Sequence, residues 1–82
     1  MPKFLDVHEG MAGVTSEQLA AAHQADLDIQ SAEGVSFTHA WADPKTGHVF
    51  CLAEGPSVEA VQRVHQRAGH PATRIHEITV SV

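Results

Sequence analysis

The chain has a single cysteine, Cys51, among its 82 residues. One thiol cannot form a disulfide within the chain, and the sequence lacks the cysteine framework of small secreted domains. We therefore expect a reducing, cytoplasmic setting. The start, MPKFLDVHEG, has a polar residue at every second or third position, so it contains neither a signal-peptide core nor a membrane-spanning segment. A soluble protein without membrane association is the expectation.

Basic side chains are also scarce, because five Lys and Arg stand against ten Asp and Glu, for a formal net charge of -5. This excess of acid repels phosphate backbones and leaves no basic stripe, which argues against nucleic acid as a partner. Histidine is abundant by contrast, and its seven copies outnumber Lys and Arg together. Imidazole is the commonest metal ligand in proteins and also titrates near neutral pH, so this excess needs an explanation.

The length predicts one small domain, residues 1–82, with a thin core. A chain of this size buries only about 60 to 65% of its unfolded surface. Small domains gain stability from disulfides, metals or self-association. With no disulfide available, a metal ion and a homodimer are the remaining means of stabilisation.

Hydrophobic periodicity predicts the order strand, helix, strand, strand, helix, strand. Thr15 and Gln18 form a capping box that starts the first helix, and Ser57 caps the second. With right-handed crossovers, this order gives an α+β, ferredoxin-like βαββαβ fold, in which a four-stranded antiparallel sheet carries both helices on one face. The expected strands are residues 3–8, 35–42, 48–54 and 74–80, and the expected helices are residues 16–32 and 58–68.

The sequence DPKTG predicts a hairpin in which Asp43 pairs with His48. This register sets His39 opposite Leu52, and it sends Cys51 to the face beneath the helices as a buried structural thiol. The same register sets Phe37 opposite Glu54. The open face would then carry an apolar surface that a second copy of the chain could cover as a homodimer. Its expected members are Phe37, Trp41, Phe50 and Leu52.

Candidate metal ligands follow from the alternation of side chains between the two faces of a strand. Two of them follow each other on one side of the first strand, and the other two are expected from neighbouring strands on the same open face. Imidazole with carboxylate suits Zn, Ni, Cu, Mn or Fe, while hydrogen-bonded histidines around an apolar patch are the alternative interpretation. The proposed ligands are Asp6, His8, His39 and Glu54, followed by His48, Cys51 and His76.

The segment VFCLAEGPSVEAVQRVHQRAGHPATRI, residues 49–75, resembles the signature of a family of small bacterial nickel-binding proteins, a domain of unknown function. In that pattern a strand with Cys51 and Glu54 leads through a proline into a helix with Val61 and His65, and then to Pro71. The resemblance implies nickel as the metal, a ferredoxin-like fold and a dimeric state. It does not by itself identify the ligands.

The leading hypothesis is a non-catalytic protein that binds nickel, or another late first-row divalent metal, in metal sequestration or metal response. The alternative is a small dimeric α+β-barrel enzyme of the cofactor-free monooxygenase or isomerase type. Its pocket between sheet and helices would be lined by Asp6, His39 and Trp41, with a histidine as general base. A third hypothesis is an interaction module that binds no ligand.

Overall fold

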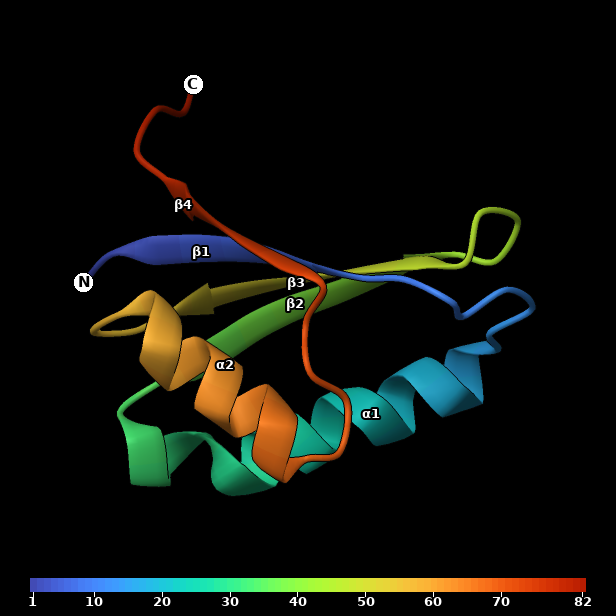
Figure 1. The fold of residues 1–82 in the computed structure, drawn as a ribbon, viewed down its shortest axis with the longest axis horizontal. Coiled ribbons are helices and arrows are strands. Elements are labelled where there is room, and N and C mark those ends of the chain that lie inside the picture. Colours follow the sequence, from blue (N-terminus) through green and yellow to red (C-terminus); the bar gives the residue numbers. More distant parts are fainter.

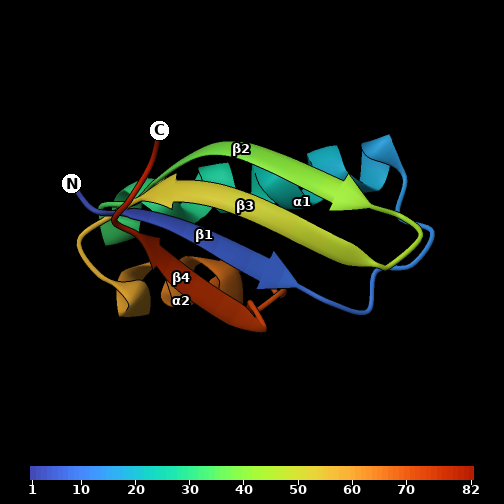
Figure 2. The ribbon, with the colours of Figure 1, turned by 90° about the horizontal axis from the view of Figure 1, so that it is seen from above.

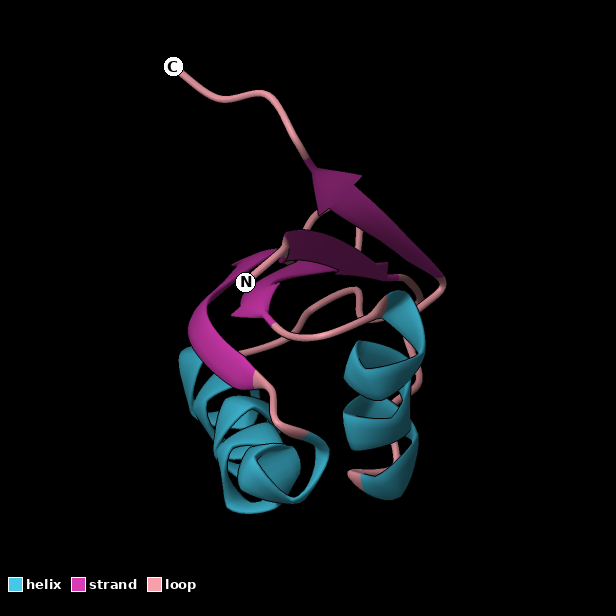
Figure 3. Ribbon diagram, turned by 90° about the vertical axis from the view of Figure 1, so that its left-hand side faces the viewer, coloured by secondary structure: helices cyan, strands magenta, loops and turns pink.

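Strands and helices follow one another along the chain in the expected order. The structure is a computed structural model that describes residues 1–82. Figures 1 and 3 show one sheet with both helices on a single face, and Figure 2 looks onto the opposite, open face. The strands are antiparallel in the order β2-β3-β1-β4, so the ferredoxin-like fold is confirmed. The elements are β1 (Lys3–His8), α1 (Ser16–Ile29), the 3-10 helix η1 (Gln30–Glu33), β2 (Ser36–Asp43), β3 (His48–Glu54), α2 (Val58–Arg67) and β4 (Arg74–Ile78).

Side-chain caps start both helices where the sequence predicts. The Gln18 backbone N–H donates to the Thr15 hydroxyl at 3.1 Å, and the Thr15 N–H donates to the Gln18 side chain at 3.0 Å. Ser57 accepts from the Ala60 N–H in the same way at α2. The α-helical part of the first helix ends at Ile29 and η1 continues it to Gly34, whose positive φ of 68° stops the chain's helical path.

The β2–β3 hairpin has the predicted register, with Asp43 opposite His48 and His39 opposite Leu52. Gly47 closes its loop with a φ of 79°, and a Cβ atom at this position would lie 2.7 Å from the backbone nitrogen of Ala12. Glycine is therefore required both by the turn and by the close approach of the loop after β1. The Met11 N–H donates to the Gly47 carbonyl at 2.9 Å and joins the two loops.

The pairing of Phe37 with Glu54 is wrong, because a β-bulge lies between Phe37 and His39. Phe37 pairs with Ala53 and turns to the helix-covered face, where its exposure is 4%. The bulge adds a residue to β2 relative to β3, so the residues on its two sides no longer follow one alternation. Phe37 therefore belongs to the core and not to the open face.

The placement of Asp6 and His8 on the open face is also wrong. Phe4 lies on the same side of β1 and is 1% exposed, while Asp6 and His8 are 0% and 5% exposed. Asp6 pairs directly with Cys51, and directly opposite residues share a face of the sheet. Because Phe4 packs into the core under the helices, the alternation of β1 carries both polar side chains into the interior with it.

The two faces of the sheet differ in what covers them. The helices cover a core that includes Phe4, Phe37, Val49, Cys51, Val61 and Val64. On the open face, Trp41 is 45% exposed. Neither α1 nor α2 combines the length and the apolar composition that crossing a bilayer requires. The half-buried apolar side chains that alternate with the core residues in β1 and β3 are Leu5, Val7, Phe50 and Leu52.

Candidate metal centre

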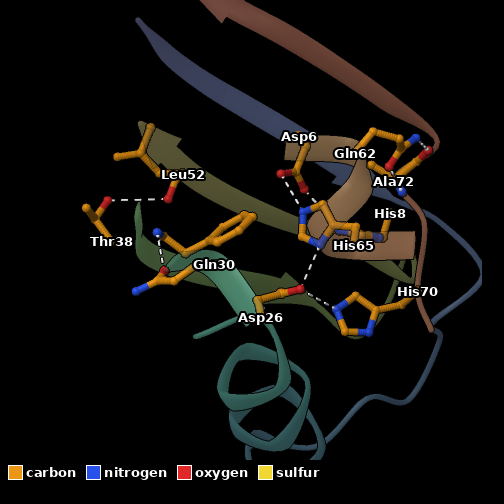
Figure 4. A network of polar contacts seen from close by, with 11 residues as sticks. Asp6, His8, Asp26, Gln30, Thr38, Leu52, Gln62, His65, His70 and Ala72 are labelled. Carbon is orange, nitrogen blue, oxygen red and sulfur yellow. Dashed lines mark hydrogen bonds and ion pairs between the residues drawn. The ribbon is translucent and has the colours of Figure 1, made fainter. Parts of the chain in front are cut away.

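A buried histidine connects the two helices and the sheet. His65 of α2 is 0% exposed, and its ring nitrogens contact carboxylates on opposite sides (Figure 4). Nε2 lies 2.7 Å from Asp6 Oδ2 on β1, and Nδ1 lies 3.0 Å from Asp26 Oδ1 on α1. Asp26 is itself 1% exposed. The three side chains therefore form a continuous polar chain through the centre of an otherwise apolar core.

Helix periodicity explains how His65 and Asp26 come to face the interior. His65 follows Val64 and lies one turn after Val61, and both valines are fully buried. Asp26 lies one turn after Ala22 on α1, on the side that faces the sheet. Neither His65 nor Asp26 is among the ligands proposed from the sequence. The available signal was a polar residue at an inward position on each of the two helices.

The charges of Asp6, His65 and Asp26 stabilise one another. Burial by itself lowers the pKa of His65, but hydrogen bonds to Asp26 and Asp6, together with their charges, raise it to about 9. Burial opposes ionisation of Asp6 and Asp26, yet the hydrogen bonds from His65 hold the pKa of both carboxyls below the usual value. At neutral pH an imidazolium therefore lies between two carboxylates, and the three groups carry one net negative charge.

His8 lies against Asp6, at one end of the polar chain formed by Asp6, His65 and Asp26. Its Nε2 atom is 2.9 Å from Asp6 Oδ1, and its ring meets that of His65 edge-on at 4.5 Å between centroids. The Nε2–Oδ1 contact is close but lacks the geometry of a hydrogen bond, and neither atom has another partner. A buried polar atom without a partner costs about 1 to 3 kcal/mol, so this pair needs an explanation.

His70 lies against the Asp26 end, where its Nε2 is 3.0 Å from Asp26 Oδ1. The His70 side chain is 25% exposed, so most of the ring is buried beside Asp26. Three hydrogen bonds hold the loop that carries it. The His70 N–H donates to the His65 carbonyl at 2.9 Å, and the Gln62 amide exchanges two 2.9 Å hydrogen bonds with the Ala72 backbone. His70 is therefore held in place by α2.

Cys51 is the remaining donor near Asp6. Its Sγ and one donor atom from each of Asp6, His8 and His65 lie within 4.8 Å of one another. Burial raises the pKa of the thiol far above its usual range, and the negative charges of Asp6 and Asp26 add to the effect. The thiol is therefore protonated in the metal-free chain.

A small cavity reaches these side chains from the α1 side. It has a volume of about 70 Å³ and lies between α1 and the sheet. Its walls are mostly apolar, with Met11, Leu19 and Val49 among them. The histidine, aspartate and cysteine side chains that line it are His8, His23, Asp26, Cys51 and His70.

The donors fit a late first-row divalent metal. Two ligands about 2.1 Å from an ion and at a right angle to each other lie about 3.0 Å apart. Asp6 Oδ1 and His8 Nε2 are 2.9 Å apart, and both lack a hydrogen-bond partner. An ion between them would take both atoms as ligands, and its positive charge would offset the net negative charge of Asp6, His65 and Asp26. Imidazole nitrogen and carboxylate oxygen are both suitable ligands for such ions.

The sheet separates the sequence-predicted ligands into two pairs. Asp6 and His8 lie together beneath the helices. His39 and Glu54 lie on the other face, where His39 stacks on Trp41 with ring centroids 4.4 Å apart. The expectation that all the proposed ligands converge is therefore wrong. Asp6 is also on the opposite face from Trp41, so the pocket expected for an enzyme is not formed by those residues.

The three further candidate ligands, His48, Cys51 and His76, are also far from forming one group. Cys51 lies beside Asp6, as described above. His48 lies at the end of the hairpin, 4.0 Å from Glu9, and His76 is exposed opposite Leu5.

The sequence profile of a protein family, described as nickel responsive protein SCO4226-like, matches residues 4–78. The chain belongs to this family. Among solved structures, the crystal structure of SCO4226 from Streptomyces coelicolor A3(2) is 60% identical in sequence and superposes with a TM-score of 0.96. The match covers 98% of this chain and 99% of that one. A comparison with curated proteins gave no match.

Membership of the SCO4226-like family confirms the resemblance drawn from residues 49–75. The family description connects these proteins with a response to nickel. In this SCO4226-like chain, the side chains with a suitable donor set are the two buried groups that share His65. They are Asp6, His8, Cys51 and His65 in one group, and Asp26, His65 and His70 in the other.

Proposed function

We propose that this protein binds nickel at the buried cluster, with His8 Nε2 and Asp6 Oδ1 as the first ligands. The observation that carries the proposal is the pair itself. Two buried donor atoms lie 2.9 Å apart, and neither has a hydrogen-bond partner. His70 and Asp26 offer further donors on the other side of His65. The protonated His65 holds both carboxylates in place and is a positioning residue.

The role that we propose is sequestration of nickel or response to it, without catalysis. The cavity beside the cluster measures about 70 Å³. Small-molecule sites typically measure about 300 to 1,000 Å³, so an ion with a few waters suits this space better than an organic substrate. The net charge of -5 and the unpaired, buried Cys51 favour a cytoplasmic protein that does not bind nucleic acid.

We also propose a homodimer that forms through the open face of the sheet. Trp41 is 45% exposed there and is flanked by the half-buried Phe50, which pairs with it across β2 and β3. Such an apolar sheet surface is most simply covered by a second copy related by a two-fold axis. His39 and Glu54 lie on this face, so they remain proposed donors only in combination with the facing subunit.

Equilibrium dialysis against Ni, Zn, Cu and Co, read by elemental analysis, tests the proposal. We expect nickel to be retained by the folded protein at neutral pH and to be lost when the protein is unfolded in urea. The control is a chain with His8→Ala and Asp6→Asn, which keeps every other histidine. Equal retention of nickel by this variant would show that the ion binds elsewhere.

A further inference from the structure

A second hollow lies on the outside of the molecule, between α1 and the edge strand β2. It has a volume of about 320 Å³ and is wide open to solvent. Ser16 and Ala20 line it from the helix, and Thr38 and His39 line it from the strand. The bulge in β2 leaves Thr38 without a partner in the strand register, and Thr38 lines the groove at this point.

This outer groove and the inner cavity share part of their walls. Leu19, His23 and Ala40 line both of them. These side chains therefore separate solvent in the groove from the cavity that His8, Asp26 and His70 line. Leu19 and Ala40 have no donor atom, so His23 is the only metal-binding side chain in the shared wall.

One ring nitrogen of His23 makes no hydrogen bond. Its Nδ1 atom is buried and has no hydrogen-bond partner. A buried imidazole nitrogen without a partner is costly, and neither the fold nor the proposed ligand pair uses it. His70, the other partly exposed histidine at the cavity, differs in this respect, because its Nε2 is held by Asp26 at 3.0 Å. Rotation of the His23 ring therefore breaks no side-chain hydrogen bond at Nδ1.

We propose that His23 is a relay ligand through which nickel passes from the α1–β2 groove to the buried cluster. The inference rests on the proposed function, because it assumes that the ion ends at His8 and Asp6. The ion loses bound waters as it passes between the side chains that separate the groove from the cavity. A transient ligand there supplies a donor atom in place of those waters. It acts on the way in and on the way out, so it changes both rates and leaves the equilibrium affinity unchanged.

Stopped-flow mixing of the full chain with nickel and a chromophoric nickel chelator tests this relay. For His23→Leu, which keeps the size of the side chain, we expect association to slow by about tenfold or more. Dissociation should slow by the same factor, so the dissociation constant should stay within about twofold of the wild-type value. His48→Leu is the matched control, because it removes a histidine outside both hollows and should leave both rates unchanged.

A second variant tests the route without altering the wall. Ala20 is exposed and lines only the groove, so Ala20→Trp should obstruct the groove and slow association several-fold with unchanged affinity. Wild-type rates in Ala20→Trp, or in a folded His23→Leu chain, would overturn the relay while the proposed function stands. A tenfold weaker affinity of His23→Leu with unchanged association would make His23 a ligand of the bound ion and would also overturn it. A wild-type chain that binds no nickel would remove the proposed function and the relay together.

Discussion

Asp6 and His65 are 59 positions apart in the chain, yet Asp6 Oδ2 and His65 Nε2 lie 2.7 Å from each other in the fully buried centre of the molecule. The contact joins the first strand to the second helix, and His65 continues it to Asp26 on the first helix. The sheet and each of the two helices therefore contribute one charged group to the same buried polar chain. The stability of the fold and the geometry of the proposed metal site depend on the same side chains.

Replacement of His65 should be strongly destabilising. His65→Leu roughly keeps the volume but leaves Asp6 and Asp26 buried without their shared cation, and an uncompensated buried charge costs about 3 to 5 kcal/mol. Urea unfolding followed by circular dichroism measures the loss. Arg63→Ala is the control, because it breaks an ion pair with Glu33 in which the Arg63 side chain is 53% exposed. That control should cost less than about 1 kcal/mol, and a similarly small loss in His65→Leu would contradict the buried-charge argument.

The free energy of unfolding should be highest between about pH 4 and pH 6.5. His65 has a pKa of about 9 in the fold against 6.5 when unfolded, so its contribution is complete below pH 6.5 and disappears as the pH rises through about 9. The lowered pKa values of Asp6 and Asp26 affect the free energy of unfolding at acidic pH. Their contribution is present above the ordinary value of 3.8 and is lost as the pH falls below it.

Urea titrations at a series of pH values measure this profile. The alkaline decrease due to His65 should amount to at most about 3 to 4 kcal/mol, because one pKa unit corresponds to about 1.4 kcal/mol. In His65→Leu the decrease between pH 6.5 and 9 should disappear. A wild-type stability that rises steadily from pH 6.5 to pH 9 would show that His65 is neutral in the fold.

Removal of the His8 imidazole should weaken nickel binding. We expect His8→Ala to lose at least about tenfold in affinity by calorimetry at pH 7.5, because it removes one of the two unpartnered donors. His48→Ala should bind as the wild type does, since His48 lies at the hairpin end. If His39→Ala loses affinity while His8→Ala does not, the ion binds on the open face, and the buried pair is not the site.

Cys51 should contribute to packing and not to nickel affinity. Its 4% exposure and the raised pKa of its thiol predict slow reaction with thiol reagents in the folded chain. Cys51→Ala should lower the free energy of unfolding by about 1 to 2 kcal/mol and change nickel affinity less than twofold. Rapid labelling that nickel prevents would instead identify the sulfur as a ligand.

A charge on the open face should prevent association. Trp41→Glu places a carboxylate where the proposed dimer buries an aromatic ring, and each buried aromatic contributes roughly 2 to 3 kcal/mol. Sedimentation velocity at micromolar concentration should show the wild type as a dimer and this variant shifted to monomer. Lys45→Glu, in the exposed hairpin loop, is the control for a new negative charge. A monomeric wild type would remove the dimer proposal.

The sequence by itself determined the elements and their order. The capping box at Thr15, the cap at Ser57 and the turn at Asp43 to His48 are local features, and each is observed where it was predicted. Local hydrogen bonds and turn conformations depend on neighbouring residues, so they can be inferred from neighbouring letters. The resemblance over residues 49–75 also identified the family correctly.

Only the tertiary structure decided which face of each strand is covered. Alternation shows that Asp6 and His8 share a side of β1, but the burial of Phe4 among distant core residues determines that this side is the inner one. One bulge in β2 likewise moved Phe37 to the core and left His39 on the open face. The contacts of His65 with Asp6 and Asp26 span 59 and 39 positions. No local pattern specifies such pairs, because they form only when the helices pack on the sheet and exclude water from all three charges.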